Sequence, residues 1–149
     1  MAISVIATIT NLGRSKIADM TISGRGFQVQ QLVVGSGGHD TGDVTIAISP
    51  EPNDATLRQQ TFGPKDLVFP APPLSGILVT PFCPTFHAFL DFTEANGPVS
   101  NYGLIARVTS SLIPLDPLIG TTFLFAIGNT PLKTKTDGDQ WDLEILLQT

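Results

Sequence analysis

The segment FQVQQLVVGSGGHDTGD, from Phe27 to Asp43, changes abruptly from strand-like to turn-like composition. Valine and phenylalanine in its first half favour extended backbone, whereas a group of glycines interrupts regular structure. We therefore predict a strand over Phe27–Val34 and a structural corner immediately after it. The corner glycines are Gly35, Gly37 and Gly38. At least one of the three is expected to have a positive φ, which glycine adopts at little cost.

Similar short runs recur along the chain, separated by clusters of Gly, Pro, Asn and Asp. This is the pattern of an all-β domain. The other candidate strands are Val44–Ile48, Gly76–Phe82, Thr85–Phe92, Tyr102–Thr109, Thr121–Ile127 and Trp141–Leu147. One helix is expected at about residues 10–20, capped by Thr10 and Asn11 and stopped by Gly24. The pattern predicts one mainly β domain over residues 1–149, an antiparallel β-sandwich or barrel with a short N-terminal helix.

Three segments refine this picture. The Trp141–Leu147 run alternates apolar and polar residues, which places Trp141 on an inner face. The run Phe123–Ile127 is apolar on both sides and suits either a central strand or one covered by another chain. Residues 50–75 are rich in proline, which removes ladder donors, so an ordered excursion or a sheet edge is expected there.

Composition excludes several classes of partner. The 149 residues include 14% charged side chains, below the usual share of about a quarter, so much of the surface is expected to be uncharged or covered by other chains. The net charge of -5 offers no basic field to nucleic acid or an anionic membrane. With no basic leader and no span-length apolar run, we expect an untargeted, soluble chain. The single Cys83 cannot form an intramolecular disulfide and is expected in the core.

The chain lacks a convincing catalytic constellation. The glycines after Val34 do not open a helix as Gly-x-Gly-x-x-Gly, and no Gly-Lys-Ser/Thr follows them. No serine lies in Gly-x-Ser-x-Gly. Cys83 and His87 would lie about 13 Å apart along one strand, too far for a hydrogen bond. We therefore expect neither enzymatic activity nor a cofactor.

The residues after the glycine corner leave a metal site open. His39, Asp40 and Asp43 could offer one nitrogen and two oxygens to an ion. The favoured interpretation is that Asp40 or Asp43 caps the turn by accepting backbone N–H groups, with His39 exposed.

The order of these motifs resembles the N-terminal attachment region of phage tail fibre proteins of the tail-collar fibre type. The likeness rests on the helix ITNLGRSKIADM, the segment FQVQQLVVGSGGHD and the C-terminal third, and is poor over residues 50–100. The matching positions are Thr10, Asn11 and Gly13, then Val34, Gly35, Gly37 and Gly38, then Gly103-Leu104, Leu124-Phe125-Ala126, Lys133 and Lys135. Because the chain stops at Thr149, an adaptor or short fibre component is expected rather than a complete fibre.

The resemblance implies a structural protein of a virion tail, made in the host cytoplasm, that works by assembly. A homo-oligomer is expected, with a trimer favoured, together with other tail, baseplate or fibre proteins as partners. The leading contact candidates are Phe123, Phe125 and Leu146, followed by Leu118, Ile119 and Leu147. The alternative is a β-sandwich module for a small ligand or carbohydrate, with Trp141, Tyr102 or His87 in contact with it.

Overall fold

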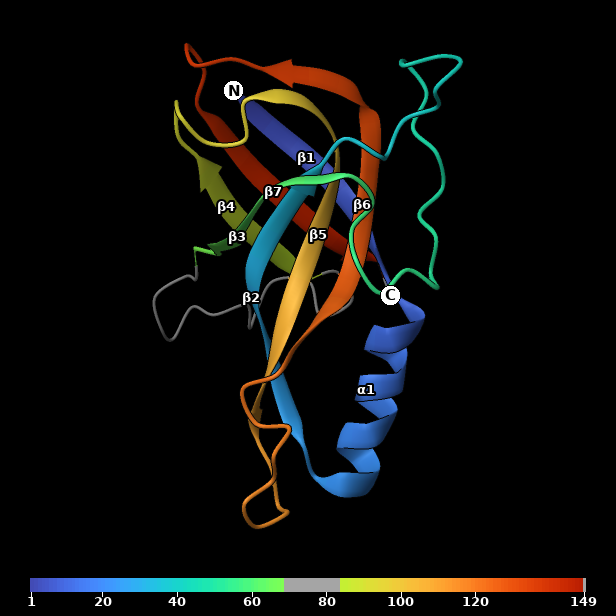
Figure 1. Ribbon diagram of the computed structural model, residues 1–149, viewed down its shortest axis with the longest axis vertical. Coiled ribbons are helices and arrows are strands. Elements are labelled where there is room, and N and C mark those ends of the chain that lie inside the picture. The colour runs from blue at the N-terminus through green and yellow to red at the C-terminus, as the bar shows by residue number, and fades with distance from the viewer. Residues whose placement is uncertain (69–83, 149) are drawn as a thin grey trace.

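The computed structural model describes residues 1–68 and 84–148 and contains one helix and seven strands within them (Figure 1). The elements are β1 (Ala2–Ile9), α1 (Asn11–Ser23), β2 (Gly26–Gly35), β3 (Gln60–Asp66), β4 (Thr85–Leu90), β5 (Gly97–Ser110), β6 (Thr122–Lys135) and β7 (Trp141–Gln148). The predicted mainly β class and the single N-terminal helix are therefore confirmed.

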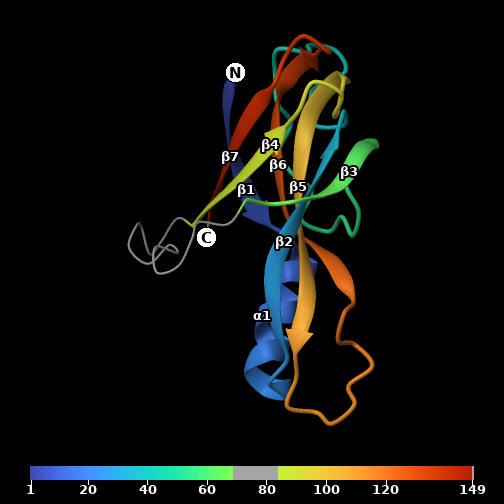
Figure 2. The ribbon, with the colours of Figure 1, turned by 90° about the vertical axis from the view of Figure 1, so that its left-hand side faces the viewer.

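All seven strands belong to one sheet in the order β3-β2-β5-β6-β1-β7-β4. Neighbouring strands are antiparallel except β1 and β7, which run parallel. The sheet curls until its two edges approach, and the N–H of Val68, just past β3, donates to the carbonyl of His87 in β4 at 2.8 Å. Figure 2 shows this curled shape edge-on. The barrel-like prediction is confirmed as a half-barrel, whereas the antiparallel sandwich is not confirmed, since the described strands form one mixed sheet.

The concave side of the sheet holds the core. Alternate residues of the strands point into it, as the period of an extended chain requires. In β7 the buried residues are Trp141, Leu143, Ile145 and Leu147, as predicted, and in β1 they are Ile3, Val5, Ala7 and Ile9. Tyr102 and Trp141 are among the largest fully buried side chains. Strands β1 and β7, from opposite ends of the described chain, therefore share one apolar interior.

Helix α1 begins where its sequence predicts and is stopped by the predicted Gly24. The Thr10 hydroxyl accepts a hydrogen bond from the N–H of Gly13 at 2.9 Å and donates to the Leu124 carbonyl at 2.8 Å. This cap satisfies an otherwise free helix donor and ties the helix to β6 at the same time. Gly24 ends the helix in the left-handed conformation, with φ of 74°. Compared with the prediction, the helix is one turn longer at its C-terminal end.

Several strand predictions were wrong or fall outside the described residues. Val44–Ile48 forms turns and contributes only a single bridge between Ala47 and His39. Strand β1 was not expected. β3 lies inside the proline-rich segment at the edge of the sheet, one of the two arrangements predicted for that segment and the position that proline tolerates. Three predicted features lie outside the described part of the chain: the strand Gly76–Phe82, Cys83, and residues 69–75 of the proline-rich segment.

Within residues 1–68 and 84–148, no helix is long and apolar enough to cross a membrane.

Candidate functional site

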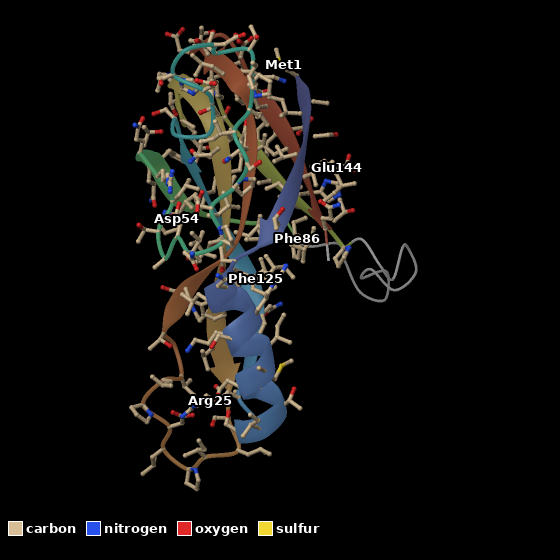
Figure 3. All side chains as sticks on the ribbon, turned by 90° about the vertical axis from the view of Figure 1, so that its right-hand side faces the viewer. Met1, Arg25, Asp54, Phe86, Phe125 and Glu144 are labelled. Atoms are coloured by element: carbon tan, nitrogen blue, oxygen red, sulfur yellow. The ribbon has the colours of Figure 1, made fainter. Side chains whose placement is uncertain are left out.

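The end of the molecule opposite Met1 combines the last turn of α1 with the loop of residues 111–121 between β5 and β6 (Figures 1 and 3). The long strands β5 and β6 carry this loop beyond the half-barrel. Gly24 brings the two segments together, because a Cβ there would lie 2.6 Å from the Leu112 side chain. Helix end and loop therefore form one surface.

Asp116 fixes this loop from the inside. Its side chain is fully buried, and its carboxylate accepts hydrogen bonds from Arg25 Nε at 2.6 Å, Ser111 Oγ at 2.6 Å and the N–H of Leu118 at 3.0 Å. Arg25 also pairs with Asp19 of α1 at 3.2 Å. The start of β2, the helix and the loop are thus joined by one network, so the loop is held in a defined shape.

The electrostatics of the network match its geometry. The hydrogen bond from Arg25 lowers the pKa of Asp116 to about 2, and the bonds from Ser111 and the Leu118 N–H act in the same direction. The bond to Asp116 and then that to Asp19 raise the pKa of Arg25. Both groups are therefore charged at neutral pH, and the interaction is an ion pair.

The side chains around this ion pair are apolar and exposed. Leu115 is 100% exposed, Ile22 86% and Leu112 84%. Met20, Ile113 and Ile119 are exposed as well. We call these six residues the apolar tip. Exposed apolar side chains gathered in one region are a common feature of interaction surfaces.

Phe123 and Phe125 do not belong to an assembly surface, which corrects the sequence-based prediction. They are 8% and 5% exposed and pack against Phe27 at ring-centroid distances of 5.3 and 5.4 Å. Lys16 of α1 lies over the Phe123 ring at 5.7 Å. Figure 3 shows Phe125 beside the start of the helix. The helix covers one side of β6, so the chain itself supplies the cover that the sequence assigned to another subunit.

The other side of β6 is covered too. Leu124 and Ile127 pack with Val33 and Leu57, the last of which comes from the segment between β2 and β3. This second small cluster explains why the strand is apolar on both faces.

The remaining assembly candidates divide into two groups. Leu147 is buried in the half-barrel, and Leu118 is half-buried beside Asp116. Leu146 is half-buried on the outer face of β7, next to the exposed Ile6 of β1 in the strand register. Ile119 is exposed and belongs to the apolar tip. Leu146 and Ile119 therefore keep their predicted role as candidates.

The glycine corner is structural for a reason different from the predicted one. None of Gly35, Gly37 and Gly38 has a positive φ, so that expectation was wrong. Instead a Cβ on Gly38 would lie 2.1 Å from the Ser100 carbonyl oxygen, and one on Gly35 would lie 2.5 Å from Asn101 Oδ1. The corner needs glycine because the start of β5 passes directly against it.

The polar residues after the corner serve the loop itself. The Asp40 carboxylate accepts from the Gly42 N–H at 2.8 Å, and that of Asp43 accepts from the Thr45 hydroxyl at 2.6 Å and its N–H at 3.0 Å. These bonds, the hydroxyl first, lower the pKa of Asp43. The predicted capping role is confirmed for both carboxylates. Among the described residues no group of three His, Cys, Asp or Glu could hold a metal ion.

His39 is not the exposed side chain that was expected. It is half-buried, and its Nδ1 shares a hydrogen bond with Ser100 Oγ at 2.8 Å. The Ser100 hydroxyl also accepts from the Gly38 N–H at 2.9 Å. This is a serine–histidine pair, but Ser100 is 0% exposed, so its oxygen cannot reach a substrate. The hydrogen bond between His39 and Ser100 attaches the corner to β5. Sequence reasoning missed this contact because the two residues are 61 positions apart.

The proposed ligand contacts are not gathered at a binding site. Tyr102 and Trp141 are each 1% exposed inside the half-barrel, whereas His87 is exposed on edge strand β4. A cleft of about 170 Å³ lies between the start of α1 and residues 50–52. Pockets for drug-sized ligands usually enclose about 300–1,000 Å³, so this cleft is small for such a role.

Comparison with known proteins gave no counterpart: no protein-family model, no curated protein and no solved structure matches this chain.

Proposed function

We propose that this chain is a non-catalytic structural component of a phage virion tail that acts by protein–protein assembly. The observation that carries the assembly role is the apolar tip, in which six large apolar side chains are exposed, four on the loop fixed by the Asp116–Arg25 pair and two on the end of α1. Exposed apolar area is unfavourable in a subunit that stays alone, and a fixed loop loses little entropy when a partner binds. Both properties favour a permanent docking surface.

The tail assignment depends on the sequence resemblance, which covers the helix, the glycine corner and the C-terminal strands. In this proposal the chain is a homo-oligomer, with a trimer favoured, that also contacts another tail, baseplate or fibre protein. It is made in the host cytoplasm and resides in the virion. Low charge on the chain as a whole is consistent with surface that other subunits cover.

The assembly role is tested by placing a charge on the tip. Leu115 is fully exposed, so Leu115→Asp is expected to leave the fold intact and to abolish association, measured by sedimentation velocity and by co-purification with co-expressed neighbouring tail proteins. Val44→Asp is the matched control, since Val44 is an exposed apolar residue, 45% accessible, in the loop after the glycine corner. Association that survives Leu115→Asp would contradict the proposed docking surface.

The tail assignment has its own test. The gene is expected to lie beside tail, baseplate or fibre genes, and mass spectrometry of purified particles of the encoding phage should find the chain at fixed stoichiometry. A location within a metabolic operon would contradict a virion role.

A further inference from the structure

The charges of this chain are divided along its long axis. Residues 11–28 and 105–123, which form the part of the molecule around the apolar tip, contain four basic side chains against two acidic ones. The basic residues are Arg14, Lys16, Arg25 and Arg107, and the acidic ones are Asp19 and Asp116. The rest of the chain then contains four of its 8 basic residues and eleven of its 13 acidic ones. One half carries a net charge of about +2 and the other about -7 at neutral pH.

Part of the surplus positive charge is available to a partner. Asp19 and Asp116 both pair with Arg25, whereas Arg14 borders a cleft together with Glu51 and Lys16 lies over the Phe123 ring. Arg14 and Arg107 are exposed. The apolar tip therefore lies at the end of a basic half, which favours a partner surface that is apolar at its centre and acidic around it.

The opposite end of the same molecule combines exposed apolar side chains with surrounding carboxylates. Met1 is 66% exposed there and Phe92 45%. The Met1 ammonium group donates to the Gln140 carbonyl at 2.8 Å, and the Gln140 amide donates to Asp91 at 2.8 Å, so the two neighbouring turns meet at Met1. Around them lie the carboxylates of Asp91, Glu94, Asp137, Asp139 and Asp142. The neighbouring cations are Lys65, which is paired with Glu94, and Lys133 and Lys135 at the end of β6. We call this region the acidic end.

The acidic end is also ordered. Lys135 is 1% exposed, and its ammonium group donates to the Asp91 carbonyl at 2.7 Å and to Asn96 Oδ1 at 3.0 Å. Lys65 pairs with Glu94 from the edge strand. Hydrogen bonds from Gln140 and from the Phe92 N–H lower the pKa of Asp91, which keeps this carboxyl charged at neutral pH. Both ends are thus preformed, and Figure 3 shows Met1 and Arg25 at opposite extremes.

We infer that the apolar tip of one copy docks on the acidic end of the next copy, so that the chain assembles head to tail. This inference rests on the proposed assembly role and names the partner of the tip. The contact joins two different surfaces, and every subunit carries both an apolar tip and an acidic end. Such a contact closes into a ring where the rotation between copies permits, and a trimer is the smallest ring; otherwise it continues as a filament.

The experiment uses two variants of the full chain, each with one damaged end. Leu115→Asp damages the tip, and Phe92→Asp damages the acidic end. Both residues are exposed, and circular dichroism checks that each variant is folded. Sedimentation velocity is expected to show wild-type oligomers larger than a dimer and each variant alone as a 15.8 kDa monomer. An equimolar mixture should then form a species of twice the monomer mass and nothing larger, because only one intact tip meets one intact acidic end.

Other outcomes overturn the inference in distinguishable ways. If Phe92→Asp assembles like the wild type while Leu115→Asp does not, the tip pairs with another tip, and only the assembly role survives. If Ile6→Asp, on the outer face beside Leu146, is what breaks the oligomer, the contact is lateral. A wild-type monomer that still captures a tail protein through the tip also refutes self-assembly, and so does preferential binding of the tip to anionic vesicles. Weaker association at high salt is expected, since the ends carry opposite charge.

Discussion

Gly38 shows how closely the chain packs on itself at the corner after β2. The sequence correctly identified the glycines as structural, but it assigned their role to backbone conformation. The actual constraint is the carbonyl of Ser100, which lies 62 residues further along the chain. Local sequence reveals where a turn lies, whereas a steric contact with a distant strand depends on the complete fold.

Gly38→Ala should therefore destabilise the protein by about 1–3 kcal/mol, the usual cost of forcing extra volume into a packed site. Gly138→Ala is the matched control, because the nearest atom to a Cβ there is 3.8 Å away. Urea unfolding of both variants measures the difference. Equal midpoints for the two would contradict the close approach described at the corner.

His39→Ala is expected to lower the free energy of unfolding by about 1 kcal/mol through loss of the hydrogen bond to Ser100. The earlier expectation of an exposed, replaceable histidine predicts no change. A double-mutant cycle separates the bond from other effects: in a Ser100→Ala background the histidine substitution should cost less than it does alone. Fully additive costs would mean that the two side chains do not interact.

The loop between β5 and β6 is the element that sequence analysis interpreted least well. Its SLIPLDPLIG segment has Leu and Ile before, between and after two prolines, and this density of apolar residues in a loop is the signal that could have marked it as a surface. Instead the apolar strand that follows the loop led to the assignment of Phe123 and Phe125 as subunit contacts. The missed residues were Ile22, Leu112 and Leu115, together with the Arg25–Asp116 pair that connects residues 91 positions apart.

Acid should loosen this loop. The pKa of Asp116 is about 2 in the folded chain and about 3.9 in an unfolded one. Its contribution to stability is therefore fully present above the unfolded value and declines as the pH falls from about 4 towards 2. Thermal unfolding across that interval should show a shallower fall in Tm for Asp116→Asn than for the wild type. Asp137→Asn, in an exposed turn, is the control and should retain the wild-type slope.

The contact between α1 and β6 is intramolecular packing, and its loss should unfold the subunit. Phe125→Ala removes a 5% exposed ring that touches Phe27 and lies under the helix, at an expected cost of about 3–5 kcal/mol. Chemical unfolding gives the free energy, and sedimentation of the folded fraction gives the assembly state. A variant that keeps full stability but fails to assemble would restore the earlier assignment of Phe125 to a subunit interface.

At the scale of the whole molecule, the sequence predicted the mainly β class of the fold better than it predicted how the strands pair and curl into one half-barrel. An alternating pattern identified β7, apolar runs identified most of β5 and the first part of β6, and turn residues placed the helix ends, because those signals are local. Strand β1 shows the same alternation at Ile3, Val5, Ala7 and Ile9, a local signal that was missed. Its pairing with β6 and β7, which come more than 100 residues later, depends on the complete fold. One curled sheet instead of two stacked ones is likewise decided by long-range pairing.

The parallel pairing of β1 with β7 also has a consequence for how the protein is made. β1 is synthesised early, but its two neighbours in the sheet, β6 and β7, are among the last described segments to leave the ribosome. Until then the buried face of β1 has no sheet to join, and pairings between distant segments form slowly. Nascent chains stalled before β7 should therefore remain protease-sensitive and bind chaperones, and they should become resistant only after β7 has emerged.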